Sequence, residues 1–160
     1  MRTVQQWFNE YGQSHQNHTN KLIHWVCVPL IFFSIVGLLA SIPSGALKGL
    51  FPPQLQLYAH FGTVLILLGL LFYLRLSVSM FIGMAFVCAV MLWAVHTVQA
   101  YVAAPLWLVC LVVFVLAWTG QFYGHKVEGK KPSFLKDLQF LLIGPAWLLG
   151  FIYRKLGIPY

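Results

Sequence analysis

Long apolar runs separated by short polar segments dominate the chain. Four of these runs, at about residues 22–42, 55–75, 78–99 and 105–123, each hold about 20 residues. A helix needs about 20 residues, at 1.5 Å each, to cross roughly 30 Å of hydrocarbon. The pattern therefore predicts an all-α fold, a polytopic bundle of four transmembrane helices in a single membrane-embedded domain over residues 1–160.

Residues 1–13 show a different periodicity. Apolar side chains recur at Val4, Trp7, Phe8 and Tyr11, with the spacing i, i+3, i+4 and i+7, and polar side chains fill the other side. This spacing is typical of an amphipathic helix. We expect a short helix in the membrane interface, because tryptophan and tyrosine favour the depth of the lipid headgroups.

The last apolar run, residues 138–153, is shorter than the other four. Gly144 and Pro145 interrupt it, and such a break frees backbone groups that need partners other than lipid. Two interpretations stay open, a short fifth span or a re-entrant or interfacial segment. The break favours the second of them.

Composition indicates a membrane protein. Hydrophobic residues make up 60% of the chain and charged residues 8%, whereas about a quarter of the residues in a soluble domain are charged. The formal net charge of +7 comes from lysines and arginines scattered between the apolar runs or just beyond them. We therefore expect contacts with anionic lipid and none with nucleic acid.

Lysine and arginine positions predict the orientation. Four spans would leave seven of these residues on the side of the N-terminus and, before the last run is counted, only Lys48 on the other. Because segments rich in lysine and arginine stay preferentially in the cytoplasm, we expect a cytoplasmic N-terminus. The polar start of the chain argues against a cleavable signal peptide, and the small size suits a bacterial inner membrane better than the endoplasmic reticulum. The seven residues are Arg2, Lys21, Arg75, Lys126, Lys130, Lys131 and Lys136.

Two polar islands stand out against this apolar background. The first places His15, His18, Asn20 and His24 at the start of the first span. Four spans return the chain to its starting side, so we expect this island to meet the second one. Imidazole is the commonest protein ligand for transition metals, which makes the meeting point a candidate metal site. The second island follows the fourth span and contains Gln121, Gly124, His125, Lys126, Glu128, Lys130 and Lys131.

Three classes of function fit such a site. Neutral imidazoles with a carboxylate suit iron, zinc, copper or nickel. Oxygen chemistry needs open positions on a redox-active metal, which favours iron. Zinc would favour a lipid hydrolase, through a metal-bound water with a pKa of roughly 7. In the third class the protein is a non-catalytic membrane scaffold or small transporter, and the histidines bind only water and headgroups.

The order of the polar residues resembles that of the membrane-embedded 2-hydroxy fatty acid dioxygenase family, whose members act in fatty acid α-oxidation. The resemblance covers nearly the whole chain. It implies an enzyme that depends on iron(II), Fe(2+), and uses molecular oxygen to shorten a 2-hydroxy fatty acid by one carbon. The residues that carry it are His15, Asn17, Asn20, His24, Pro29, Gln121, Gly124, His125, Glu128 and Pro132.

The resemblance implies His15, His24 and His125 as iron ligands. In the family pattern the acidic residue stands four positions after the histidine of the Gly-His pair, whereas Glu128 stands three after His125. His18 is not part of the shared pattern. We carry His18 and Glu128 as additional candidate ligands.

The other polar residues are candidates for supporting roles. Asn20 and Gln121 are expected to fix the orientation of the imidazoles, as the neighbours of metal-binding histidines usually do. Lys126, Lys130 and Lys131 are expected to pair with the substrate carboxylate or with anionic lipid.

Overall fold

The computed structural model describes residues 2–129 and 140–160, and these residues form helices and no strand. The predicted all-helical class is confirmed. The helices in chain order are α1 (Val4–Gly12), α2 (His18–Ala40), α3 (Gly45–Lys48), the 3-10 helix η1 (Pro53–Tyr58), α4 (Phe61–Leu76), α5 (Val78–Tyr101), α6 (Leu106–Glu128) and α8 (Ile143–Leu156).

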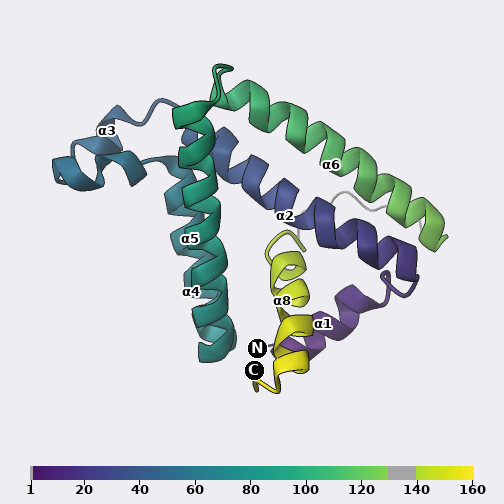
Figure 1. Ribbon diagram of the computed structural model, residues 1–160. Helices are drawn as coiled ribbons and strands as arrows, with labels where there is room; N and C mark the ends of the chain where they lie inside the picture. Colours follow the sequence, from purple (N-terminus) through teal and green to yellow (C-terminus); the bar gives the residue numbers. More distant parts are fainter. Residues whose placement is uncertain (1, 130–139) are drawn as a thin grey trace.

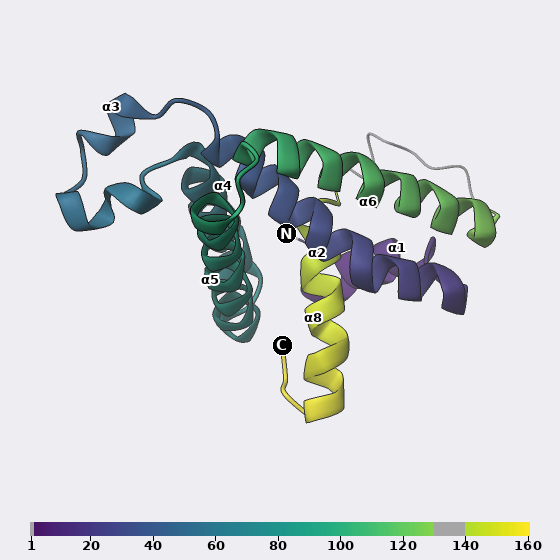
Figure 2. The same cartoon turned by 45° about the horizontal axis from the view of Figure 1, so that its top comes forward.

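Two pairs of helices organise the fold (Figure 1). Helices α2 and α6 lie side by side, and α4 and α5 form a hairpin that crosses them steeply. Helix α8 lies in the angle between the two pairs and contacts α1, α2 and α5 (Figure 2). The short α3 and η1 segments lie at the far end of α2, away from α1.

Three of the described helices, α2, α5 and α6, are long and apolar enough to cross a membrane. Their lengths are compatible with a membrane protein. The continuous helix predicted over residues 55–75 is wrong, because η1 and α4 divide that segment. Helix α4 is apolar but has 16 residues, or about 24 Å at 1.5 Å per residue. A core of four full-length spans is therefore not confirmed.

Local chemistry explains this division. Pro52 and Pro53 have no backbone N–H, so no α-helix enters the segment from the residues before it, and the 3-10 helix η1 starts at Pro53. Further on, the His60 imidazole accepts a hydrogen bond from the Thr63 N–H at 3.2 Å. This bond caps the first turn of α4, which starts at Phe61.

Most of the described part of the last apolar run is helical despite its Gly-Pro pair. Helix α8 begins at Ile143, so Gly144 and Pro145 fall in its first turn. A proline is tolerated there, because the N–H that it lacks would have no helical partner. At 14 residues the helix is shorter than the roughly 17 to 25 residues of a span. Its position relative to the membrane stays a prediction.

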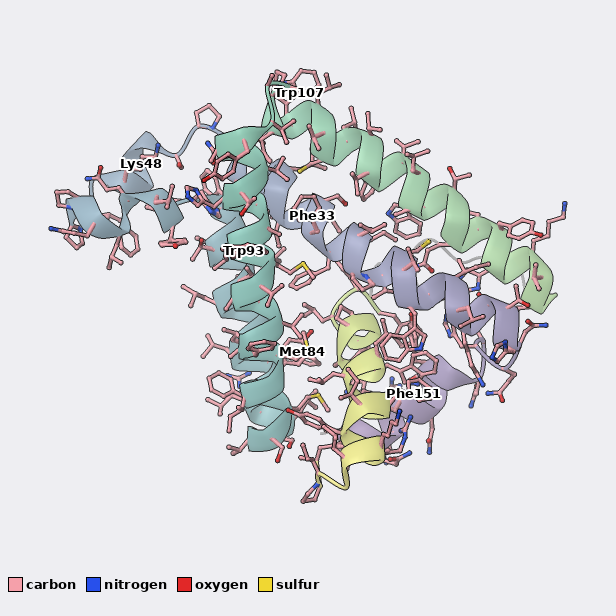
Figure 3. All side chains as sticks on the ribbon, in the orientation of Figure 1. Phe33, Lys48, Met84, Trp93, Trp107 and Phe151 are labelled. Carbon is pink, nitrogen blue, oxygen red and sulfur yellow. The ribbon has the colours of Figure 1, made fainter. Side chains whose placement is uncertain are left out.

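Helix α8 is fixed to the α4–α5 hairpin. Met84 is fully buried and points between α5 and α8 (Figure 3). The Tyr153 hydroxyl donates a hydrogen bond to the Ser79 carbonyl at 2.7 Å, and the Tyr73 hydroxyl donates one to the Leu142 carbonyl. These bonds fix the position of α8 along the hairpin and so place the first turn of α8.

Helix α1 has the amphipathic pattern that the sequence predicts. Thr3 and Gln6 form a reciprocal capping box at its start. Its buried side chains Val4, Phe8 and Tyr11 pack in one cluster with α8. The apolar face of α1 is thus covered by protein, and the Tyr11 ring points into the molecule. The interfacial location of this helix stays a prediction.

Candidate metal centre

Two glycines on α6 let this helix lie very close to α2. A Cβ added at Gly120 would stand 2.7 Å from Cys27 Sγ, and one at Gly124 would stand 2.5 Å from Asn20 Oδ1. Both distances are shorter than a real carbon contact, so only glycine permits this approach. The last turn of α6 therefore reaches the first turns of α2, and the two polar islands meet.

His15, His24 and His125 gather at this meeting point. His15 lies between α1 and α2, His24 on α2, and His125 in the last turn of α6. One nitrogen from each ring lies within 4.8 Å of the other two. The side chains are almost fully buried, with exposed fractions of 1%, 0% and 4%. Buried imidazoles at this spacing are a ligand set for a transition metal.

Backbone carbonyls fix the tautomers of two of these rings. His15 Nδ1 lies 2.7 Å from the Tyr11 carbonyl oxygen, and His24 Nδ1 lies 2.9 Å from the Asn20 carbonyl oxygen. A carbonyl only accepts, so each Nδ1 must carry the hydrogen and each Nε2 a lone pair. The two Nε2 atoms lie 2.8 Å apart. Two lone pairs at that distance repel unless a cation lies between them.

Either a proton or a metal ion could lie between these two nitrogens. Burial lowers the pKa of His15 to about 4, against the opposing effect of the bond to the Tyr11 carbonyl. A shared proton is therefore disfavoured at neutral pH. Neutral imidazoles bind divalent transition metals. The donor set of His15, His24 and His125 fits such an ion.

Glu128 lies beside the histidines, and its carboxylate is already engaged. One oxygen accepts from the Gln16 N–H at 2.7 Å, and the other accepts from the Asn17 N–H at 2.9 Å and from Asn20 Nδ2 at 3.0 Å. Among the described residues, Glu128 does not belong to the group of ligand atoms formed by the three histidines. Asn17 caps α2, so Glu128 ties the end of α6 to the start of α2, where the helix dipole favours a negative charge.

Asn20 connects the histidines to this anchor. Its backbone carbonyl holds His24, and its side-chain amide donates to the Ser14 carbonyl at 3.2 Å as well as to Glu128. Its side chain is fully buried, and Oδ1 faces Gly124 without a hydrogen-bond partner among the described residues. A larger residue at position 124 would have to displace Asn20.

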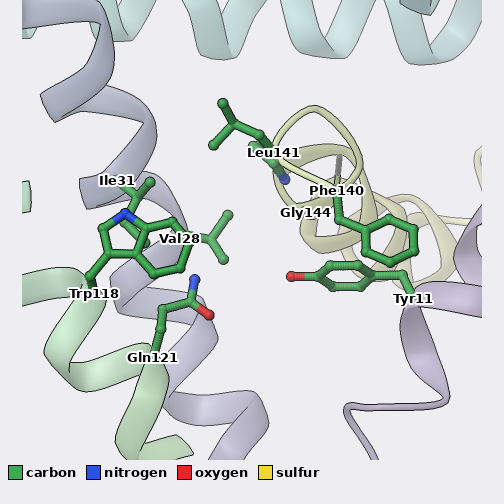
Figure 4. A pocket seen from close by; sticks show the side chains of 9 residues that line it. Tyr11, Val28, Ile31, Trp118, Gln121, Phe140, Leu141 and Gly144 are labelled. Atoms are coloured by element: carbon green, nitrogen blue, oxygen red, sulfur yellow. The ribbon is translucent and has the colours of Figure 1, made fainter. Parts of the chain in front are cut away.

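A small cavity is lined by neighbours of the histidines, among them Tyr11 and Gln121 (Figure 4). Its volume is about 30 Å³, enough for one or two water molecules. The Tyr11 hydroxyl and the Gln121 side-chain amide point toward one another across it. The Tyr11 ring stacks on His15 with centroids 4.2 Å apart, and Gln121 stands one turn before His125 on α6. Two polar groups are thus aimed into a space beside the metal ligands.

Comparison with known proteins assigns the chain to a family. A family model described as "2-hydroxy-palmitic acid dioxygenase Mpo1-like" matches residues 1–156. The chain belongs to the Mpo1-like family. The match confirms the resemblance seen in the sequence and covers every described helix. No curated protein and no solved structure matches the chain.

The remaining predicted site residues of this Mpo1-like chain lie in different surroundings. His18 is the first residue of α2 and is exposed, outside the three-histidine group. Lys126 is exposed on the last turn of α6. Gln121 is buried and lines the cavity. Two further candidates, Lys130 and Lys131, lie outside the described residues.

Two aromatic residues of the Mpo1-like site were missing from the sequence prediction. Tyr11 stacks on His15, and the Trp147 ring centroid lies 5.5 Å from that of His15. The only sequence signal for Tyr11 is its place four residues before His15, which served instead to predict an interfacial helix. Trp147 gives no local signal, because 132 residues separate it from His15 along the chain.

Proposed function

We propose that the protein is an iron(II)-dependent dioxygenase that shortens 2-hydroxy fatty acids by one carbon. The observation that carries the proposal is the opposed pair of His15 and His24 Nε2 atoms, with His125 beside them. Membership of a family named for a 2-hydroxy-palmitic acid dioxygenase supports it. Burial of the three rings weighs against histidines that only bind water and headgroups.

The protein would supply three imidazole ligands to the iron and leave its remaining coordination positions to the reactants. His15, His24 and His125 would hold the iron, which offers open coordination positions and a change of redox state for oxygen chemistry. The Tyr11 and Asn20 carbonyls keep the ligand nitrogens of His15 and His24 deprotonated and aimed at one point. Glu128 would act as an anchor that holds the His15 segment against α6, and not as a ligand.

The cavity beside the histidines suits the polar head of the substrate. A 2-hydroxy acid carries a carboxylate and a hydroxyl on adjacent carbons, and both groups need hydrogen-bond donors when they leave water. The Tyr11 hydroxyl and the Gln121 amide are donors aimed into the cavity. They would orient C1 and C2 toward the histidines and exclude bulk water from the reacting atoms.

The reaction balances with molecular oxygen as its only oxidant. The bond between C1 and C2 breaks, C2 rises from the alcohol to the carboxylic acid level, and C1 leaves as carbon dioxide. One dioxygen accepts the four electrons, and its atoms together with those of the substrate give the shortened acid, carbon dioxide and one water. No external reductant is needed, so we expect none in the assay.

The membrane would deliver the substrate. We propose a cytoplasmic N-terminus in a bacterial inner membrane, with the metal centre at the cytoplasmic face. Lys126, exposed at the end of α6, would meet anionic headgroups or an approaching carboxylate, and the same role is proposed for Lys130 and Lys131.

A zinc-dependent lipid hydrolase is the second candidate. The observation that favours it is the donor set itself, because three neutral histidines with an open position also form a catalytic zinc site. A hydrolase would work without oxygen and would keep its activity with zinc. The two candidates therefore separate on metal identity and on oxygen uptake.

The deciding experiment is metal analysis of protein purified in detergent without oxygen. We expect about one iron per chain in the natural sequence, loss of that iron in His125→Ala, and no loss in His18→Ala, the exposed control. Oxygen uptake with 2-hydroxyhexadecanoic acid should then match carbon dioxide release one to one. Zinc in the natural protein, or no metal after reconstitution with iron, would overturn the dioxygenase.

A further inference from the structure

An apolar groove lies next to the cavity, and the two share one residue. The groove has a volume of about 260 Å³ and lies between α2, α5 and α8. Pro145, in the first turn of α8, lines both spaces. Except for the Trp25 indole, every side chain that lines the groove is a hydrocarbon or a thioether. Such a lining suits an alkyl chain and excludes a charged ligand.

Two adjacent stripes of side chains on helix α2 line the cavity and the groove. His24, Val28 and Ile31 follow one stripe, from the metal ligand to the wall of the cavity. Trp25, Pro29 and Phe32 stand one residue later and line the groove. One residue corresponds to a turn of about 100° around a helix. The metal centre, the cavity and the groove thus lie along neighbouring faces of the same stretch of α2.

The groove has a closed floor and an open rim. Phe32 and Leu148 are buried in its floor, with exposed fractions of 5% and 4%. Phe86 and Ile152 stand at its rim, with exposed fractions of 73% and 43%. Phe86 at this rim stands on α5, one of the three described helices long enough to cross a membrane. A chain could therefore enter from the hydrocarbon of the bilayer without passing through water.

We propose that this groove holds the alkyl chain of the substrate and sets the preferred chain length, with Pro145 marking the passage from head to tail. The inference rests on the proposed function for the identity of the head group. A methylene group occupies nearly the volume of a water molecule, about 30 Å³, so the groove takes on the order of nine methylenes. A substrate chain fits this place better than bulk lipid, because Pro145 lines both the groove and the cavity, so a head group in the cavity would leave its chain beside the groove.

The first test maps the course of the alkyl chain directly. The probe is 2-hydroxyhexadecanoic acid with a photoreactive diazirine about eight carbons beyond C2, within the length that the groove accommodates, bound to the natural protein in detergent and irradiated. We expect labelled peptides from the groove segments of α5 and α8, around Val90 and Ile152. Unlabelled 2-hydroxyhexadecanoic acid should remove the label, and the same concentration of a phospholipid should not. Label on α6 instead, or equal competition by the phospholipid, would overturn the assignment.

The second test fills the groove from its rim. Val90 lines the groove with an exposed fraction of 41%, so Val90→Trp adds volume without entering the buried core. Its matched control is Val112→Trp on α6, where Val112 is 50% exposed and lines neither the cavity nor the groove. Each methylene excluded from the groove weakens binding about fourfold.

We therefore expect the preference for the sixteen-carbon over the six-carbon 2-hydroxy acid, as a ratio of kcat/KM values, to fall at least roughly tenfold in Val90→Trp. The ratio should stay unchanged in Val112→Trp. An equal fall of this ratio in both variants, or no fall in Val90→Trp, would overturn the assignment of the groove to the alkyl chain. If Val90→Trp does not fold, the photolabelling of the natural protein still decides.

The outcomes separate this inference from the proposed function. Labelling of the groove in a protein that oxidises no 2-hydroxy acid supports a site for lipid chains and overturns the dioxygenase. Oxidation with unchanged chain-length preference in Val90→Trp supports the dioxygenase and overturns the groove. The photolabelling reads binding alone, so it does not depend on an active metal centre.

Discussion

The Nε2 atoms of His15 and His24 lie 2.8 Å apart, and the Nδ1–H group of each ring donates a hydrogen bond to a backbone carbonyl. This opposition of two lone pairs is the geometric feature that most favours a cation at the site. Desolvation makes a proton a poor choice at neutral pH, because burial lowers the pKa of His15 to about 4. The same fact predicts how the metal-free protein responds to acid.

Acid should destabilise the metal-free protein through His15. Between the ordinary pKa of 6.5 and the folded-state value of about 4, the unfolded chain binds a proton that the folded chain refuses. Stability from this group is therefore complete above pH 6.5, falls as the pH drops toward 4, and changes no further below that. Thermal unfolding in detergent with a chelator, followed from neutral pH to pH 4, measures this loss.

The control for the acid experiment is His15→Gln, which removes the titrating ring. Its melting temperature should fall less steeply over the same pH range. An identical slope in the two proteins would mean that other groups carry the acid sensitivity. Iron retention should move in the same direction, because protons compete with a metal for the imidazole nitrogens.

Glu128→Gln should weaken the metal site without removing a ligand. A neutral amide cannot accept on both of its polar atoms, so one of the bonds to the Gln16 and Asn17 N–H groups is lost. We expect a loss of stability of about 1 to 3 kcal/mol and iron affinity lower by roughly 10- to 100-fold. Titration with iron, followed by metal analysis, measures the affinity.

A matched control for Glu128→Gln is Lys126→Gln, on the same turn of α6 but exposed. It should bind iron as the natural protein does. If Glu128 is instead a ligand, Glu128→Gln should resist saturation with iron as strongly as His125→Ala does. Recovery of full occupancy at high iron concentration would support the anchor.

Gly124→Ala should separate α6 from α2. The added carbon would stand 2.5 Å from Oδ1 of the buried Asn20, and a displacement of this side chain would strain its hydrogen bond to Glu128. Overpacking of this kind costs about 1 to 3 kcal/mol. Gly45→Ala is the control, because nothing lies within 4 Å of a carbon added there. Equal melting temperatures for the two variants would contradict the close approach of the helices.

Tyr11→Phe should impair substrate binding while leaving the metal in place. The ring that stacks on His15 and the carbonyl that holds it both remain, so we expect unchanged iron content. The hydroxyl that points into the cavity is lost. A hydrogen bond to a charged group contributes about 1.5 to 3 kcal/mol, so kcat/KM should fall by roughly tenfold or more. Tyr123→Phe, at an exposed position of α6, serves as the control.

The prolines show where the local sequence correctly indicates the limits of a helix and where it gives a wrong indication. Pro52 and Pro53 keep an α-helix from running into the predicted second span, because neither has an N–H to donate, and the 3-10 helix η1 starts at Pro53 instead. Pro145 suggested a broken segment in the last run, yet it lies in the first turn of α8, where no N–H is required. A proline thus has opposite effects depending on where the helix starts, and the apolar pattern alone leaves that start undetermined.

The candidate metal site, too, was predicted only in part, because local sequence does not show where a helix starts. Metal-binding residue types beside an apolar run identify His15, His24 and His125 as candidates, together with His18. His18 stands three residues after His15, but it starts α2 and is exposed. His15 lies before the helix, so the spacing of a continuous helix does not apply to the pair.

The sequence by itself determined the helical class, the apolar runs and the family, because these follow from composition, periodicity and the order of polar residues. Only the tertiary structure decided how the polar residues divide their roles. His15 and His24 face one another, Glu128 binds backbone N–H groups, and Pro145 joins a cavity to a groove. Such contacts join segments that are far apart in the chain, as Glu128 and Gln16 are, which stand 112 positions apart. Local periodicity carries no record of these distances, because the packing of the helices alone sets them.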